Sequence, residues 1–193
     1  YVGQTAPKTA AICRDAYGGV LFIDEAYSLF RSGNEDTPDY GQEAIDTLVA
    51  EMENHRSDLL VIFAGYPEEM DTLMKANPGL AGRMPYQIDF PNYTREELAA
   101  IFFRFAEKSF AFDDAFRAAV SAYFSSLSQT VIENKEFGNA RFVRNLYERT
   151  WGKAALRCQL QDLPCDTLTN EDFALAIAEK EFQAVTEHKR IGF

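Results

Sequence analysis

Two short runs of apolar residues stand out along the chain. "VLFID" spans residues 20–24 and "LLVIFAG" spans residues 59–65. A short unbroken apolar run bounded by glycines is typical of a strand that is covered on both faces, as in a parallel sheet. We therefore expect two buried parallel strands, and a third candidate strand at "YQIDF", residues 86–90, which Pro91 closes.

The residues between the first two runs follow a helical period. In "QEAIDTLVAEMENH" the spacing i, i+3, i+4, i+7 is occupied by Ile45, Leu48, Val49 and Met52. This spacing predicts an amphipathic helix, and the order strand, helix, strand implies a right-handed parallel crossover. Two further helices are expected over residues 7–17 and 67–77, where a proline suits the first turn.

Beyond the third candidate strand the pattern is helical only. "TREE" offers a capping box from Thr94 to Glu97. Three more helical stretches follow, in "DDAFRAAVSAYFSSL", "NARFVRNLYERTWGKAALR" and "TNEDFALAIAEKEF". The sequence thus predicts an α/β unit over residues 1–92 and an all-helical unit over residues 93–193.

Composition and charge narrow the classes of partner. The 193 residues are 47% hydrophobic, as expected of a globular protein, and 19 basic against 30 acidic residues give a net charge of -11. A strongly negative chain is repelled by nucleic acid and by anionic membrane surfaces. No apolar run approaches the roughly 20 residues that a membrane helix requires, and the first residues do not resemble a signal peptide.

The cysteines and histidines do not suggest a metal site. Cys13, Cys158 and Cys165 form no C-x-x-C pair, and His55 and His188 lie far apart. From this spacing we expect neither a zinc site nor disulfides.

The candidate chemistry begins at the end of the first strand, where Asp24 and Glu25 are adjacent. Parallel α/β sheets bind ligands beyond the carboxyl ends of their strands. Four hydrophobic residues followed by Asp-Glu also describe the Walker B element of nucleoside triphosphatases. The pattern is degenerate by itself, because a buried strand that ends in exposed acids is common.

Six motifs extend this interpretation. "YVGQTAPKT", "GGVLFIDEAYSL", "DYGQEAI", "VIFAGYPEEM", "NPGLAGRM" and "FGNARFVRN" occur in this order. Together they resemble the AAA+ ATPases of the red-type Rubisco activase and stage V sporulation protein K group. The resemblance implies the C-terminal part of a parallel-sheet P-loop AAA+ core followed by a small all-helical lid. It also implies a cytoplasmic, ring-forming hexamer that uses ATP and Mg²⁺ to thread a protein substrate through a central pore.

The resemblance assigns roles to four residues of the first unit. Asp24 would hold the magnesium ion through water, and Glu25 would be the general base. Tyr66 stands at the sensor-1 position, where simple packing is an equal alternative. Arg83 would be the arginine finger that is presented to the nucleotide of a neighbouring subunit, a task that suits a permanently charged guanidinium.

Two further segments receive roles from the same resemblance. Tyr1, Val2 and Gly3 correspond to the pore loop that grips the substrate polypeptide. Arg141 corresponds to sensor 2, which reaches the phosphates of its own subunit, and Arg144 is a second candidate on the same helical face.

One element of the family pattern is missing. No G-x-x-x-x-G-K-[ST] occurs in the chain, and the family places this phosphate-binding loop upstream of the pore loop. We therefore interpret the chain as a fragment and expect it to hydrolyse little or no ATP alone. Two alternatives stay open: an inactive AAA+ scaffold, and an AAA+ loader that acts on nucleic acid, which the acidic charge disfavours.

Overall fold

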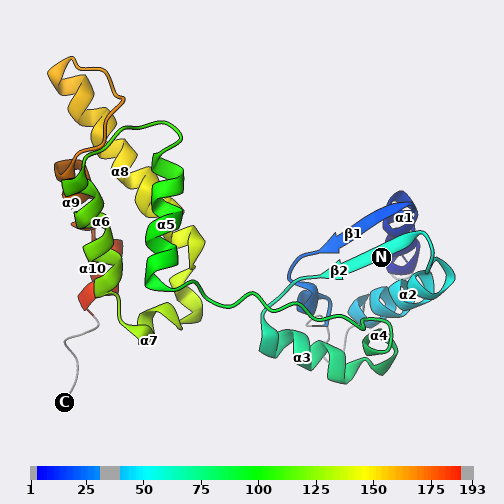
Figure 1. Ribbon diagram of the computed structural model, residues 1–193. Coiled ribbons are helices and arrows are strands. Elements are labelled where there is room, and N and C mark those ends of the chain that lie inside the picture. Colours follow the sequence, from blue (N-terminus) through cyan, green and yellow to red (C-terminus); the bar gives the residue numbers. More distant parts are fainter. Residues whose placement is uncertain (1–3, 31–39, 188–193) are drawn as a thin grey trace. The chain divides into compact units, whose positions relative to one another are not determined.

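The computed structural model describes residues 4–30 and 40–187. The chain divides into two compact units, residues 1–89 and 90–193. Each unit is described by itself below (Figure 1).

The first unit is a two-stranded parallel sheet with helices. Its elements are, in order, α1 (Thr5–Asp15), β1 (Gly19–Ile23), the 3-10 helix η1 (Ala26–Phe30), α2 (Tyr40–Asn54), β2 (Leu59–Phe63), α3 (Pro67–Ala76) and α4 (Pro78–Ala81). β1 and β2 pair in parallel, with Gly19 opposite Leu59 and Ile23 opposite Phe63. The predicted strands 20–24 and 59–65 and the helix between them are thereby confirmed to within the usual uncertainty of element ends.

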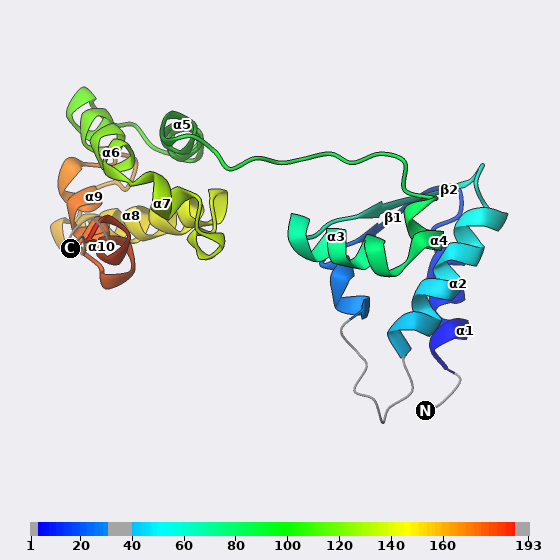
Figure 2. The same ribbon diagram turned by 90° about the horizontal axis from the view of Figure 1, so that it is seen from below.

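The helices of this unit lie on one side of the sheet. In Figure 2 α1 and α2 are seen below the two strands. The buried side chains of β2, Leu59 and Val61, pack there with Cys13 of α1 and Leu48 of α2. A second cluster joins η1, α2, α3 and α4 through Ala26, Ile45, Leu73 and Leu80.

The other side of the sheet is an exposed apolar face, which corrects the prediction of strands covered on both faces. Its side chains are 41–59% exposed and form two opposed pairs, Val20 with Leu60 and Phe22 with Ile62. Alternation along each strand directs these four side chains away from the helices. The apolar runs were therefore correct evidence for strands but wrong evidence about burial in this chain.

The third candidate strand is wrong. Residues 86–90 have no strand partner in the described part of the chain, and Tyr86, Ile88 and Phe90 are 87%, 77% and 90% exposed. A strand needs a neighbour to satisfy its backbone hydrogen bonds, and the two described strands do not provide one here. The alternating apolar residues remain, but the segment is extended chain between the two units.

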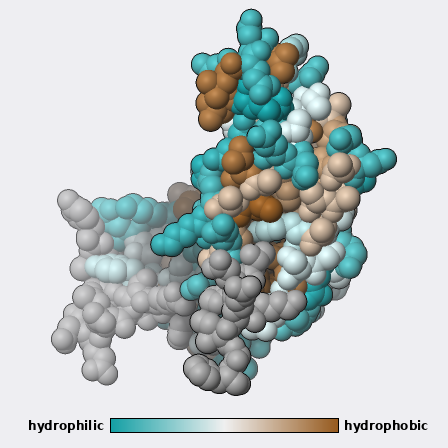
Figure 3. Space-filling view, turned by 90° about the vertical axis from the view of Figure 1, so that its left-hand side faces the viewer, coloured by the Kyte–Doolittle hydropathy of each residue, from teal (hydrophilic) through white to brown (hydrophobic). Residues whose placement is uncertain are grey.

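The second unit consists of helices around one core. Its elements are α5 (Arg95–Ala106), α6 (Asp114–Ser126), α7 (Gln129–Ile132), the 3-10 helix η2 (Lys135–Phe137), α8 (Ala140–Gln161), α9 (Asn170–Ile177) and α10 (Lys180–Glu187). Phe102 of α5 is fully buried among Phe116, Phe124 and Phe173. On the face seen in Figure 3, hydrophobic side chains appear between hydrophilic ones.

Side chains cap the starts of α5, α6 and α9 in the second unit, and the cap of α5 was predicted from the sequence. Thr94 and Glu97 form the reciprocal capping box of α5, and Asp113 caps α6. Thr169 and Asp172 form a second capping box at α9. Each box satisfies two backbone N–H groups that would otherwise lack partners at the helix end.

Asn139 links the start of α8 to the segment that enters the second unit. It occupies the cap position, but its side chain makes no cap hydrogen bond. Instead its Oδ1 accepts from the backbone N–H of Tyr93 at 3.2 Å, and its Nδ2 donates to Oδ1 of Asn92 at 2.6 Å. Asn139 thereby joins the segment before α5 to the start of α8 by two hydrogen bonds.

No helix in the described part of the chain is long and apolar enough to cross a membrane.

Candidate functional site

The carboxyl ends of β1 and β2 meet at one corner of the first unit. The N–H of Ala64 donates to the carbonyl of Ile23 at 2.9 Å, and the N–H of Ala26 donates to the carbonyl of Ala64 at 3.0 Å. These bonds hold the residues after β1 against the residues after β2. Asp24 and Glu25 sit at this junction, and both are exposed.

The backbone at Glu25 is strained. Its φ is +48°, in the left-handed region that residues with a Cβ rarely adopt, and its N–H donates to Oδ1 of Asp24 at 3.0 Å. A left-handed conformation costs a residue with a side chain about 1–2 kcal/mol. Backbone strain of this kind is found preferentially at functional sites, where the surrounding structure holds it. The strain therefore motivates a functional role for the Asp24–Glu25 turn.

Tyr66 lies at the same corner, directly before α3. It is half-exposed, and its ring centroid is 6.3 Å from that of the buried Tyr27 in η1. Gly65, the residue before it, is enclosed: a Cβ there would lie 2.8 Å from Cδ1 of Tyr27 and 2.8 Å from Sδ of Met70. Sequence reasoning missed the roles of Tyr27 and Gly65, because they depend on how η1 packs against α3.

Arg83 is engaged within its own unit. Its Nε donates to Oε2 of Glu53 at 3.0 Å, and its Nη1 donates to the carbonyl of Gly79 at 2.8 Å. The same carboxylate also pairs with Arg56, at 2.9 Å. Glu53 on α2 was not a predicted site residue, since nothing in the local sequence links it to an arginine 30 positions away.

Arg141 and Arg144 both lie near the start of α8 in the second unit, and both are exposed. The N–H of Arg141 donates to the carbonyl of Gly138 at 2.9 Å, and Gly138 has a φ of +73°. The guanidinium of Arg144 lies 6.0 Å from the centroid of the Phe105 ring. This ring contact gives Arg144 a packing role.

The predicted residues thus fall into three groups. Asp24 and Glu25 follow β1 and Tyr66 follows β2 at the corner where the two strands end, and Arg83 is held against α2 in the same unit. Arg141 and Arg144 belong to the second unit. The pore-loop candidates, Tyr1, Val2 and Gly3, lie outside the described residues.

The corner offers ligands of the type that magnesium prefers. Asp24 and Glu25 present carboxylate oxygens at an exposed turn, and Mg²⁺ binds through one or two carboxylates together with waters and substrate phosphates. Among the described residues, no group of three or more Asp, Glu, His or Cys side chains gathers to form a complete metal site. The two acids therefore fit a magnesium ion that a nucleotide brings with it, and they do not form a cage for a resident metal.

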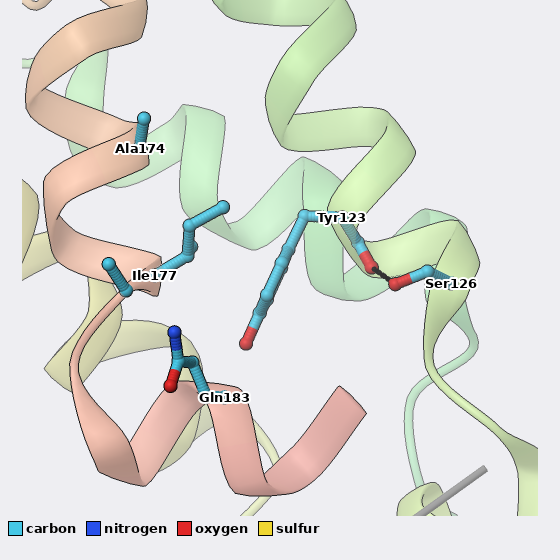
Figure 4. A pocket seen from close by; sticks show the side chains of 6 residues that line it. Tyr123, Ser126, Ala174, Ile177 and Gln183 are labelled. Atoms are coloured by element: carbon cyan, nitrogen blue, oxygen red, sulfur yellow. Dashed lines mark hydrogen bonds between the residues drawn. The ribbon is translucent and has the colours of Figure 1, made fainter. Parts of the chain in front are cut away.

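A separate cavity of about 460 Å³ lies in the second unit and contains none of the predicted site residues. Figure 4 shows the ring of Tyr123 from α6 pointing toward Ile177 of α9 and Gln183 of α10, while the Ser126 hydroxyl donates to the carbonyl of Tyr123. The hydroxyl of Tyr123 donates to the carbonyl of Phe182 at 3.0 Å, and burial raises the pKa of this phenol. The Tyr123 hydroxyl therefore joins α6 to α10 beside this cavity.

Comparison with known protein families gives two adjacent matches. Residues 1–92 match the ATPase family associated with various cellular activities (AAA). Residues 94–183 match the AAA lid domain. Together the two matches account for the α/β unit and the helical unit, in the order expected of a partial AAA+ core followed by its lid.

Individual relatives agree with these matches. Protein CbxX of Cupriavidus necator is 47% identical over 150 residues, which are 77% of this chain and 45% of the relative. Chloroplastic ribulose bisphosphate carboxylase/oxygenase activase of Cyanidioschyzon merolae is 42% identical over 181 residues, 93% of this chain and 59% of the relative. Stage V sporulation protein K of Bacillus subtilis is 39% identical over 183 residues, 93% of this chain and 56% of the relative. The chain spans about half the length of these relatives.

Proposed function

This chain belongs to the AAA family of ATPases, and from that premise we propose that it is the Walker B, arginine-finger and lid portion of a ring-forming protein-remodelling ATPase. The longer protein would couple ATP hydrolysis to the threading of a protein substrate through a central pore, as a cytoplasmic hexamer. The relative named as a ribulose bisphosphate carboxylase/oxygenase activase supports a protein substrate. No nucleic-acid or membrane partner is proposed, because the net charge of -11 opposes both.

The observation that carries the proposal is the strained acidic turn at the carboxyl ends of two parallel strands. Asp24 would help hold the hydrated magnesium ion of Mg-ATP, and this ion would neutralise part of the negative charge of the phosphates. Glu25 would orient the attacking water and accept its proton. Both tasks require exposed carboxylates beside a nucleotide, and both acids are exposed at the sheet corner.

The arginines would contact the phosphates of two different nucleotides, one in the neighbouring subunit and one in the same subunit. Arg83 would stabilise charge on the phosphate of a neighbouring subunit, and to do so its guanidinium would exchange Glu53 for that phosphate. Arg141 would contact the phosphates of its own subunit from the lid, with Arg144 as the second candidate. Tyr66 would donate one hydrogen bond near the attacking water, and Tyr1, Val2 and Gly3 would grip the substrate.

The proposal makes activity a property of the longer protein. No P-loop motif occurs in the 193 residues, so the chain alone lacks the backbone cradle that binds the β- and γ-phosphates. We expect weak Mg-ATP binding and no measurable turnover from residues 1–193, and both activities from a protein that also carries a P-loop. Absence of binding and turnover in both would favour the second candidate function, an inactive scaffold.

The decisive experiment is Glu25→Gln in the longer protein. Loss of a general base lowers turnover by roughly 10²–10⁴-fold, while ATP binding is retained because the glutamine is isosteric. Asp71→Asn is the matched control, since it removes an exposed carboxylate of the same unit from α3. Turnover by Glu25→Gln at the level of the Asp71→Asn control would refute the Walker B assignment.

A further inference from the structure

Two of the three cysteines meet where α8 leads into α9. Cys158 is in the last turn of α8 and is buried, whereas Cys165 lies in the connection and is exposed. The thiol of Cys158 donates to the carbonyl of Pro164, the residue directly before Cys165, at 3.4 Å. The two cysteines are therefore neighbours in the fold, although the sequence spacing predicted no pairing.

The connection between α8 and α9, residues 162–169, carries Cys165 and is held in place at both ends. Asp162 adopts a left-handed φ of +54° and ends α8, and the N–H of Leu163 donates to the carbonyl of Cys158 at 3.0 Å. Farther along, Nη2 of Arg157 donates to the carbonyl of Thr167 at 2.9 Å. These bonds fix the path of the connection on both sides of Cys165, so the closeness of the two cysteines is part of the folded structure.

We propose that Cys158 and Cys165 form a reversible dithiol site, which low-molecular-weight disulfides such as oxidised glutathione convert to an intrachain disulfide. The site is independent of the proposed ATPase function, because it requires only the fold of the second unit. A reversible pair of this kind is compatible with a reducing compartment, where protein disulfides are transient.

The accessibility of the two thiols sets the order of the reaction. The exposed Cys165 thiolate attacks one sulfur of oxidised glutathione, forms a mixed disulfide and releases one glutathione thiolate. The Cys158 thiolate then attacks the Cys165 sulfur and releases the second glutathione. Two protein thiols are oxidised to one disulfide, the glutathione disulfide is reduced to two thiols, and the two protons pass to the leaving thiolates.

The reaction depends on pH in a defined direction. Burial and the neighbouring Cys158 raise the pKa of the Cys165 thiol above its ordinary value. Since the thiolate is the attacking species, the first step is slow at neutral pH and accelerates as the solution becomes alkaline. The site would therefore respond to sustained oxidation more than to a brief exposure.

The disulfide would tie the connection to α8. It would close the segment 158–165 and reduce the freedom of the unfolded chain, which stabilises the folded second unit. Trp151, the single tryptophan, lies in α8, so its fluorescence reports the unfolding of this unit. We expect the oxidised chain to unfold at a temperature several degrees higher than the reduced chain, and the difference to vanish after treatment with dithiothreitol.

The test is incubation of the folded chain with oxidised glutathione, followed by peptide mapping by mass spectrometry without reduction. The expected product is a Cys158–Cys165 cross-linked peptide that has lost two hydrogen atoms, with Cys13 unmodified because it is fully buried in the first unit. Cys158→Ser should stop at a glutathione adduct on Cys165, and Cys165→Ser should leave Cys158 reduced. Cys13→Ser should behave like the parent chain.

Three results would overturn the proposal. A stable glutathione adduct on Cys165 of the parent chain would show that Cys158 does not reach it. An unmodified Cys165 at pH 9 would show that the exposed thiol does not react. A cross-link that includes Cys13 would show that the chain reacts from an unfolded state.

Discussion

Gly65 is the position at which the smallest substitution should disturb the candidate site most. It lies between β2 and Tyr66. An added Cβ would meet Cδ1 of Tyr27 at 2.8 Å and both Sδ and Cγ of Met70 at 2.8 and 2.9 Å. Gly65→Ala therefore forces η1 away from the start of α3.

The expected cost follows from these distances. Non-bonded carbon atoms prefer separations of about 3.5–4.0 Å, so the new methyl group would be too close to its neighbours by about 0.7–1.2 Å. Met70 is flexible and can yield, but Tyr27 is buried and packed. Overpacking of this kind costs about 1–3 kcal/mol, from which the lower chain entropy of alanine in the unfolded state subtracts about 0.4–1 kcal/mol. We expect a net loss of about 1–2 kcal/mol, or about 5–15 °C in the melting temperature of a unit of this size.

Two spectroscopic signals separate the two units. Trp151 is in the second unit, so urea unfolding followed by its fluorescence should be the same in Gly65→Ala and in the parent chain. Circular dichroism follows both units and should show the earlier transition of the first unit.

Gly79→Ala is the matched control. A Cβ at Gly79, in α4 of the same unit, meets only Cγ1 of Val49 at an ordinary 3.8 Å, so the substitution should be neutral or stabilising by up to about 1 kcal/mol. Equal midpoints for Gly65→Ala and Gly79→Ala would refute the packing argument.

The remaining predictions concern Glu25 in the acidic turn, Arg83, and the ion pair between Asp172 and Arg157. Glu25→Gly should stabilise the first unit by about 1 kcal/mol in urea unfolding, because glycine tolerates the φ of +48°, while the longer protein loses turnover; a destabilised variant would contradict the strain argument. If Arg83 acts on the neighbouring subunit, a mixture of Arg83→Ala and Glu25→Gln proteins should recover part of the ATPase activity that each lacks, because some sites then combine an intact Glu25 with an intact Arg83. A mixture that stays as inactive as the separate variants would exclude action between subunits. Asp172 is 1% exposed and accepts from Nε and Nη2 of Arg157 at 2.9 Å each, so Asp172→Ala should destabilise the second unit by about 3–5 kcal/mol in Trp fluorescence unfolding. Burial alone would raise the pKa of Asp172, but its hydrogen bonds to Arg157 and Thr169 lower it below 3.8; this stabilisation is therefore present above the unfolded pKa and is lost as the pH falls through the folded pKa, and a chain whose stability does not decline below pH 4 would contradict the assignment.

Several features were available from the sequence because their causes are local. Helical periodicity, proline at helix starts and the Thr94–Glu97 box act over a few residues, and α2, α3 and α5 formed where these signals predicted. The motif at residues 20–25 likewise gave the position of Asp24 and Glu25 at the end of a strand. The family followed from six ordered motifs, and the two family matches confirmed it.

The tertiary structure decided which side chains are buried and which residues distant in the sequence contact each other. An apolar run predicts a strand, but whether the faces of that strand are covered depends on which other segments pack against it. Val20 and Phe22 are therefore exposed, and residues 86–90, which have no partner strand among the described residues, form no strand. The contacts of Arg83 with Glu53 and of Cys158 with Pro164 are equally invisible in the sequence. Local conformation depends on neighbours along the chain, which the sequence records, whereas burial and side-chain pairing depend on neighbours in space, which only the packed structure brings together.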